Sequence, residues 1–108
     1  MNEKIIALIN QFVTERNWDQ FHTGSNLAKS LVLEASELLE LYQWSDEVES
    51  IERLAEELAD VFVYSIQIAE KYHLNIEEII LKKMEKNAKK YPVSLAKDNS
   101  KKYNKLKK

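Results

Sequence analysis

An all-α fold is the class that the sequence predicts: a four-helix bundle-like protomer with a short, largely irregular C-terminal tail, assembling into a homo-oligomer. Three observations predict it. The 108 residues include one glycine and one proline, so the chain offers few turns and favours long helices. Its apolar residues recur at helical spacing, and no strand-like alternation is found. The length suits one domain with a single core.

The first two helices flank a loop rich in polar and aromatic residues. The first is predicted from about residue 2 to residue 16. The loop NWDQFHTGSN follows and contains the single glycine. Asn26 or Ser25 is expected to cap the second helix, which continues to about residue 44, because side chains of this kind accept hydrogen bonds from the first free N–H groups.

The third and fourth helices follow a polar interruption, SDEVES. The third is predicted from about residue 50 to residue 72. Asn75 followed by Glu78 has the spacing of a capping box, so a fourth helix starts there and ends near residue 90. The segment beyond Pro92 lacks helical period and is expected to be extended or disordered. We therefore divide the chain into a helical domain, 1–92, and a basic tail, 93–108.

Two acids of the second helix lie where leucines are expected. At about 100° per residue, Glu34 falls inside the stripe formed by Leu27, Leu31 and Leu38, and Glu37 falls at its edge. Burial of an unpaired carboxylate is costly, so such a position requires a partner.

The third helix repeats this anomaly. The same arithmetic places Glu57, and not Glu56, among apolar residues, with Asp60 at the edge of the stripe. If the two helices pack antiparallel, Glu34, Glu37, Glu57 and Asp60 converge. Either some of them stay protonated or a cation lies among them. An all-oxygen set suits Mg²⁺, with Mn²⁺ as the alternative.

The acids have two other interpretations. Each acid could pair with a base across a bundle interface, but few Lys or Arg residues precede residue 82. A di-iron carboxylate site would require a Glu-x-x-His element on two helices. Neither His22 nor His73 follows a candidate glutamate at that spacing.

Composition and charge restrict the remaining function classes. The chain has no cysteine, which excludes disulfides and thiolate metal sites. No apolar run approaches the length of a membrane span and no signal-peptide layout is found, so we expect a cytoplasmic protein. Residues 1–81 carry a formal charge of −11 and residues 82–108 carry +9. This basic end could bind nucleic acid, meet substrate phosphates or simply be solvated.

The two middle helices are also apolar on the side away from their acids. A helix that is apolar nearly all round is buried nearly all round, so self-association as a dimer or tetramer is expected. The residues concerned are Val32, Leu33, Leu39, Phe62, Val63 and Ile66.

The two acid pairs and four flanking segments resemble the MazG-like superfamily of all-α nucleoside triphosphate pyrophosphohydrolases, and within it the dCTP pyrophosphatase-type branch. The acid pairs are Glu34-x-x-Glu37 and Glu57-x-x-Asp60. The flanking segments are W-x-x-F-H-x-x-x-N-L from Trp18 through His22 and Asn26 to Leu27, Y-Q-W ending at Trp44, E-E-L-A-D-V, and K-M-x-x-N-x-x-K-Y-P from Lys83 to Pro92.

The resemblance implies hydrolysis between the α- and β-phosphates of a nucleotide, with Mg²⁺ held by the four acids and Glu34 or Glu37 as general base. It places Trp18, His22 and Trp44 at the base, with Asn26 in the same motif. Tyr64 would meet the sugar, and the phosphates would face Lys83, Asn87, Lys90 and Tyr91. Ordinary packing of the aromatic residues and solvation of the lysines stay open as alternatives.

The function predicted from the sequence is thus Mg²⁺-dependent hydrolysis of dCTP or modified pyrimidine deoxynucleoside triphosphates. Within this enzyme class, dUTP or a broad range of triphosphates are alternatives. The contrasting hypothesis is a non-catalytic helical module with a structural acid cluster, whose basic tail binds nucleic acid. We expect a nucleotide substrate, no membrane association and no nucleic-acid partner.

Overall fold

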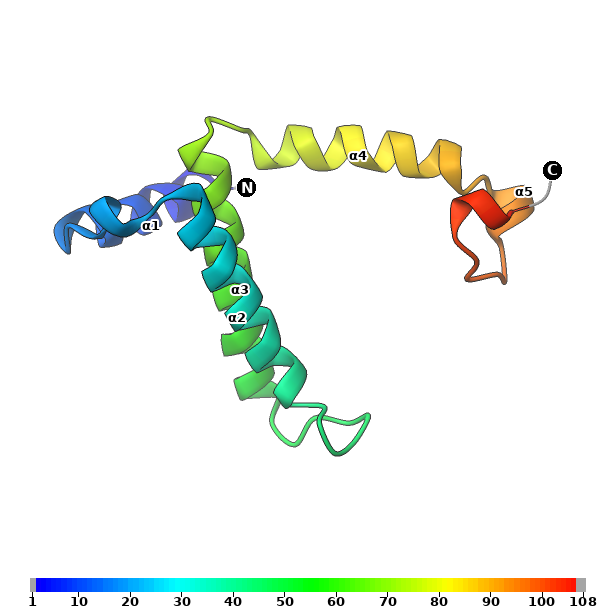
Figure 1. Cartoon of the computed structure of the whole chain (residues 1–108), viewed down its shortest axis with the longest axis horizontal. Helices are drawn as coiled ribbons and strands as arrows, with labels where there is room; N and C mark the ends of the chain where they lie inside the picture. Colours follow the sequence, from blue (N-terminus) through cyan, green and yellow to red (C-terminus); the bar gives the residue numbers. More distant parts are fainter. Residues whose placement is uncertain (1, 107–108) are drawn as a thin grey trace. The chain divides into compact units, whose positions relative to one another are not determined.

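The chain folds into two compact units, one ending at Leu74 and the other beginning at Asn75. The computed structural model describes residues 2–106, except for the side chain of Tyr103. Figure 1 shows that these residues form helices and no strand, which confirms the all-α class. The first unit contains α1 (Glu3–Glu15), the 3-10 helix η1 (Trp18–Phe21), α2 (Gly24–Glu40) and α3 (Ile51–Lys71).

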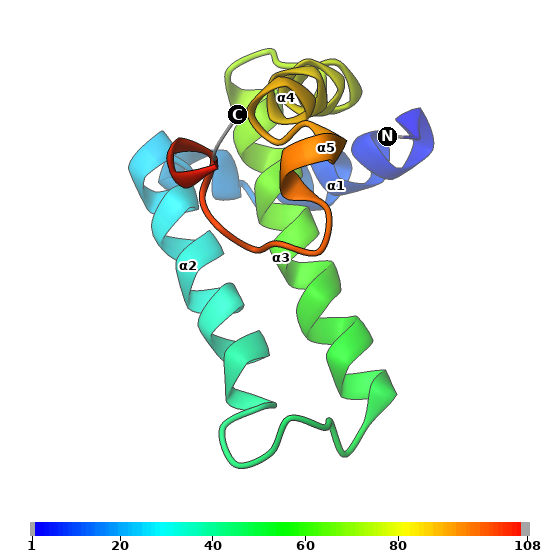
Figure 2. The same ribbon diagram turned by 90° about the vertical axis from the view of Figure 1, so that its right-hand side faces the viewer.

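The first unit is organised around a hairpin of α2 and α3. The two helices run antiparallel along each other and are joined by a loop at one end (Figures 1 and 2). At the other end α1 packs against α3, and η1 packs against α1. Four apolar side chains are buried where α1, α2 and α3 meet: Val13, Leu27, Ile66 and Ala69. The core therefore lies at the α1 end of the hairpin.

Short polar side chains start the helices of this unit. Ser50 Oγ accepts a hydrogen bond from the Arg53 amide at 3.2 Å, as the predicted start of the third helix requires. The predicted cap of the second helix was wrong. Thr23 is the N-cap, and its Oγ1 accepts from the Asn26 amide at 3.0 Å. One threonine at the last extended position satisfies the free N–H, so neither Ser25 nor Asn26 is needed there.

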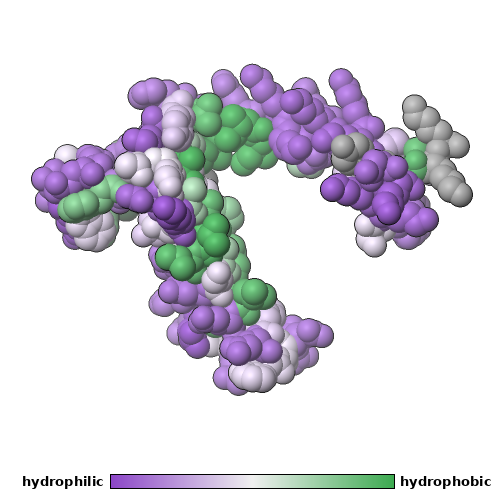
Figure 3. Space-filling view, in the orientation of Figure 1, coloured by the Kyte–Doolittle hydropathy of each residue, from purple (hydrophilic) through white to green (hydrophobic). Residues whose placement is uncertain are grey.

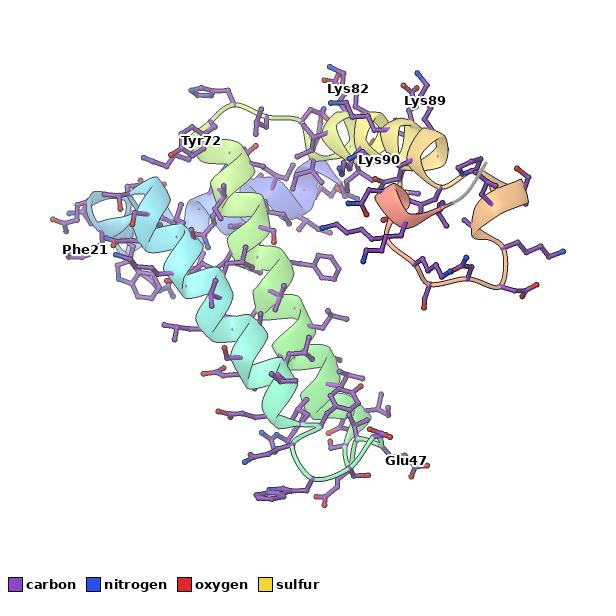
Figure 4. All side chains as sticks on the ribbon, turned by 45° about the vertical axis from the view of Figure 1, so that its right-hand side comes forward. Phe21, Glu47, Tyr72, Lys82, Lys89 and Lys90 are labelled. Atoms are coloured by element: carbon purple, nitrogen blue, oxygen red, sulfur yellow. The ribbon has the colours of Figure 1, made fainter. Side chains whose placement is uncertain are left out.

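Close packing and chain reversal fix the α1 end of the hairpin. A Cβ on Gly24 would collide with the Tyr72 ring, so the first turn of α2 requires glycine against the C-terminal end of α3. Tyr72 is labelled in Figure 4. His73 then adopts a left-handed conformation, with φ of 56°. The Leu74 amide donates to the Ala69 carbonyl at 2.8 Å, which closes α3 with a Schellman motif.

The opposite end of α2 differs from the prediction. The helix ends at Glu40 and not near Trp44. The amides of Leu41, Tyr42 and Gln43 each donate to the carbonyl three residues earlier, so the last turn tightens and the chain leaves the helix. No glycine or proline marks this end, which is why the sequence placed it too late.

The second unit contains α4 (Ile76–Lys90), α5 (Val93–Ala96) and the 3-10 helix η2 (Tyr103–Lys105). Asn75 Oδ1 accepts from the Glu78 amide at 3.0 Å, as the capping box predicts. The short helices α5 and η2 correct the expectation of an entirely extended or disordered tail. The boundary at residue 92 stays a prediction, as does the four-helix bundle, because α4 belongs to the second unit.

The hairpin exposes an apolar flank. Val32, Leu33 and Leu39 on α2 and Phe62 on α3 are exposed, Leu39 to 70%, and hydrophobic surface follows the hairpin in Figure 3. The prediction was wrong for two residues of the outer face. The Ile66 side chain is 3% exposed and belongs to the core, and the half-buried Val63 lines a cavity together with Asp60. Over the described part of the chain, no helix combines the length and hydropathy that crossing a membrane requires.

Candidate metal and nucleotide site

Three of the four predicted acids meet between α2 and α3. Carboxylate oxygens of Glu34, Glu37 and Glu57 lie within 4.8 Å of one another. Glu34 and Glu37 are one turn apart on α2, and Glu57 faces them from the antiparallel α3. The antiparallel packing that the sequence analysis required is therefore present. Asp60, one turn beyond Glu57, is outside this three-residue cluster.

Two oxygens of the cluster are buried without a hydrogen-bond partner. Glu34 Oε2 and Glu57 Oε2 are almost inaccessible to solvent, and neither is bonded by any residue that the structure describes. Glu37 is exposed and gives the cluster an open side. Buried polar atoms in folded proteins nearly always have a partner, so these two oxygens require an explanation.

The negative charges of the cluster oppose ionisation. Burial, a hydrogen bond to Glu37 that Glu34 can donate only when protonated, and the charges of Glu37, Asp60 and Glu57 together raise the pKa of Glu34 above its ordinary 4.5. A hydrogen bond to Glu37 that likewise requires the protonated form raises the pKa of Glu57, as do burial and the charges of Glu37 and Asp60, while Arg53 opposes the shift. Without a cation, Glu34 and Glu57 therefore lose their protons at higher pH than isolated glutamates do.

These residues fit a hard divalent cation. Carboxylate oxygens from two rigid helices converge, two of them lack a hydrogen-bond partner, and an exposed third acid leaves an approach open. Mg²⁺ and Mn²⁺ prefer such all-oxygen surroundings, and Mg²⁺ keeps several coordination positions for water and phosphate. Helical arithmetic also selected the correct neighbour, since Glu57 is half-buried in the cluster whereas Glu56 is exposed.

A cavity of about 340 Å³ adjoins the acids through Asp60. Trp18, His22 and Tyr64 line the same cavity, so three of the predicted nucleotide-binding residues come together with one acid. The remaining walls are mostly apolar, a composition typical of small-molecule sites of this size. They are formed by Leu8, Ile9, Phe12, Val13, Val63 and Gln67.

Aromatic packing holds Trp18 at this cavity. The Trp18 and Phe12 rings meet edge to face, with centroids 5.6 Å apart. The Arg16 guanidinium lies 3.7 Å from the Phe12 ring centroid and also donates to the Phe12 carbonyl at 3.0 Å. Asn17, in a left-handed conformation with φ of 53°, turns the chain from α1 into η1 between these contacts.

Two residues of the predicted base site lie elsewhere in the first unit. Trp44 follows α2 and is 89% exposed. It lies at the loop end of the hairpin, which Glu47 marks in Figure 4, whereas Phe21 marks the η1 end. Asn26 donates its side-chain amide to the Phe21 carbonyl at 2.9 Å and thereby holds the loop. Asn26 therefore has a structural role in holding this loop, which the sequence did not indicate.

The predicted phosphate-binding residues belong to the second unit. Lys83 and Asn87 lie one turn apart on α4, and the Asn87 amide approaches Met84 Sδ at 3.9 Å. Lys90 is the last residue of α4 and Tyr91 is its C-cap. Lys82, Lys89 and Lys90 are labelled on this helix in Figure 4. A role for these residues at phosphates stays a prediction.

Sequence reasoning missed one polar residue of the cavity. Gln67 lies one turn beyond Tyr64 on α3, and its Oε1 is buried with no partner among the residues described. Its spacing from Asp60 and Tyr64 places all three on one face of α3, which could have identified it. The apolar residues of the α1 wall carried no such signal, because they resemble ordinary core positions.

Comparison with known proteins gives one family match and several relatives. The model of a family described as MazG-like matches residues 29–106. Over 113 aligned positions the chain is 38% identical to dCTP pyrophosphatase 1 of Mus musculus and 39% identical to that of Homo sapiens. Each alignment covers 96% of this chain and 66% of the relative, so the chain spans slightly under two thirds of these proteins.

A solved structure supports the same grouping. The chain resembles a pyrophosphatase from Archaeoglobus fulgidus with a TM-score of 0.79 and 34% sequence identity. The match covers 83% of this chain and 91% of that one. The similarity thus extends to the three-dimensional arrangement of most of the chain.

Proposed function

The chain belongs to the MazG-like family, and on that premise we propose that it is a divalent-metal-dependent nucleoside triphosphate pyrophosphohydrolase that acts on dCTP or a related pyrimidine nucleotide. The observation that carries the proposal is the pair of buried carboxylate oxygens of Glu34 and Glu57 that lack a hydrogen-bond partner, in a unit whose Asp60 lines the cavity. The names of the mouse and human relatives support the choice of substrate.

Glu34, Glu37, Glu57 and Asp60 would hold Mg²⁺. The bound cation would neutralise triphosphate charge and lower the pKa of the attacking water. The water attacks the α-phosphorus and the bond to the α–β bridging oxygen breaks. Pyrophosphate then leaves with the electron pair of that bond. The water's proton would pass to Glu34 or Glu37, the two acids one turn apart on α2.

The cavity residues would bind the nucleoside. Trp18 and His22 offer flat faces on which a base can stack, and Tyr64 lines the same cavity one turn beyond Asp60 on α3. Lys83, Asn87, Lys90 and Tyr91 of α4 are the proposed partners of the phosphates. Trp44, which is 89% exposed, would reach a base only in a neighbouring protomer.

The protein is proposed to act as a homo-oligomer. The exposed Val32, Leu33, Leu39 and Phe62 supply an apolar surface on the hairpin that a second copy can cover. Burial of such a surface in the assembly would remove the cost of exposing it to water.

Pyrophosphate release tests the function. The assay compares dCTP, dUTP, dTTP and ATP with Mg²⁺ present and then with chelator. We expect release that depends on the metal and is highest with dCTP. Release spread evenly over the panel would keep the reaction and refute the pyrimidine preference. If no nucleotide is cleaved, the non-catalytic module becomes the better account, and steeply salt-dependent binding of nucleic acid would support it.

Matched variants of neighbouring glutamates test the site. Glu57→Gln removes a proposed metal ligand. Mutation of residues that only support a ligand lowers activity by up to about 100-fold, so loss of the ligand itself should lower pyrophosphate release at least about 100-fold. Glu56→Gln alters an exposed carboxylate next to it and should stay within twofold of wild type. Circular dichroism checks that both variants fold. Equal activities of the two variants would refute the assignment of Glu57.

A further inference from the structure

Gln67 separates two cavities of the first unit. Together with Val13 and His22 it lines the apolar cavity described above and a second cavity of about 380 Å³ on the other side. The second cavity also has Asp19 and Glu70 in its wall. The Gln67 side chain is half-buried, yet its Oε1 is almost inaccessible and no described residue donates to it.

The surroundings favour one orientation of this amide. The carboxylates of Asp19 and Glu70 place hydrogen-bond acceptors in the second cavity, which suits the Nε2 hydrogens of Gln67. Lys71 and His73 also line this cavity, but neither donates to Gln67 Oε1. Glu70 is held in place, because its Oε1 accepts from Asn10 Nδ2 at 3.1 Å. With Nε2 directed toward these acids, Oε1 is left as an acceptor for the apolar cavity, where the walls that the structure describes do not satisfy it.

Gln67 is placed where the base of a bound nucleotide would end. Asp60, Tyr64 and Gln67 follow one another along one face of α3, at spacings of four and three residues. The rise from Asp60 to Gln67 is about 10 Å at 1.5 Å per residue. This is comparable to the span of a nucleoside from its 5′-phosphate to the far edge of its base.

We infer that Gln67 is a specificity residue whose Oε1 accepts a hydrogen bond from the exocyclic amino group of a cytosine-type base in the apolar cavity. Cytosine presents an amino donor at this edge, whereas uracil and thymine present a carbonyl acceptor there. A keto base would set two acceptors against each other or leave Oε1 unpaired, which is the kind of mismatch that sites reject strongly. The inference rests on the proposed function, because it takes the apolar cavity as the base site.

The test compares kcat/KM for dCTP and dUTP in wild type and variants of the full chain. Gln67→Met has a similar shape without the amide, and we expect it to lower kcat/KM for dCTP about tenfold and to change that for dUTP less than about twofold, as loss of one hydrogen bond predicts. Gln67→Leu, a second variant without the amide, should lose the preference for dCTP as Gln67→Met does. Gln11→Met, on the exposed side of α1, is the control and should change neither value.

Three outcomes would overturn the inference. Wild type could show no preference between the two nucleotides. Gln67→Met could reduce both values equally, which indicates a purely structural role, or it could leave the preference intact. The Gln67→Leu variant keeps the inference testable if Gln67→Met does not fold, because an intact preference for dCTP without the amide would also refute it.

A binding measurement separates this inference from the proposed function. If wild type cleaves no nucleotide, the function fails, and calorimetry with dCMP and dUMP then tests Gln67 alone. Tighter binding of dCMP by wild type, lost in Gln67→Met, would support the inference. Equal binding of the two monophosphates by wild type would refute it.

Discussion

At the scale of single residues, the two half-buried glutamates Glu34 and Glu57 decide the chemistry of the molecule. Each has a buried oxygen that no described residue satisfies, and each has a raised pKa because burial and the nearby acids disfavour its charge. A fold that keeps such groups is less stable without a cation than the same fold with neutral side chains. This pattern is typical of a cation-binding site, in which the carboxylates repel one another until the cation neutralises their charge.

The contribution of Glu57 to the stability of the metal-free protein should therefore fall as pH rises. The folded pKa of Glu57 lies above its unfolded value of 4.5. Between these two values the folded state binds more protons, so the free energy of unfolding decreases with rising pH. In chelator and below pH 4.5, Glu57→Gln should have nearly the same melting temperature as wild type. As pH rises toward neutrality, the melting temperature of Glu57→Gln should exceed that of wild type by a growing margin.

Thermal melting monitored by circular dichroism checks this expectation. Glu56→Gln is the control, because that exposed carboxylate lies outside the cluster. Its melting temperature should follow wild type across the range. If wild type and Glu57→Gln gave parallel curves from acid to neutral pH, the repulsion would be absent.

At the scale of helices, local capping and close packing set the ends of α2 and α3. Thr23 satisfies the first turn of α2, and Gly24 allows Tyr72 to lie against that turn. These contacts fix the end of the hairpin at which Trp18 and His22 line the cavity. Helix termini therefore contribute to the site through position, without touching the acids.

The capping role of Thr23 gives a stability prediction. Thr23→Ala removes the acceptor for the Asn26 amide and should lower the free energy of unfolding by about 1 kcal/mol, measured by urea denaturation. Ser25→Ala is the matched control, since Ser25 was a predicted cap that the structure does not use. An equal loss in both variants would contradict the assignment of Thr23 as the cap.

At the scale of the whole molecule, few side chains of the single chain are buried and many large apolar ones are exposed. The apolar flank of the hairpin is on the side that the sequence predicted, except for Ile66, which completes the core, and Val63, which lines the cavity beside Asp60. A lone first unit with this surface would expose apolar area that water disfavours. Self-association is the proposed solution.

Sedimentation velocity at micromolar concentration tests this proposal. Leu39→Lys places a charge on the apolar flank and should raise the dissociation constant of the oligomer at least about tenfold, which corresponds to about 1.4 kcal/mol. Glu40→Lys introduces the same side chain at the adjacent exposed position and should leave the oligomer largely intact. A wild-type protein that sediments as a monomer would refute self-association.

The sequence by itself determined the helical class and the inward acids, because both depend on local periodicity. The cap at Asn75, the start of α3 at Ser50 and the choice of Glu57 over Glu56 follow from side-chain chemistry within one or two turns. Such features need no knowledge of the rest of the fold.

Only the tertiary structure decided which of these residues meet. The packing of α2 against α3 brings Glu34, Glu37 and Glu57 within 4.8 Å and leaves Asp60 at the neighbouring cavity. The positions of α1 and η1 join Trp18 and His22 to that cavity, add Gln67, and leave Trp44 at the other end of the hairpin. The physical reason is that helical period fixes the face on which a side chain lies, whereas convergence of faces depends on contacts between residues far apart in the chain.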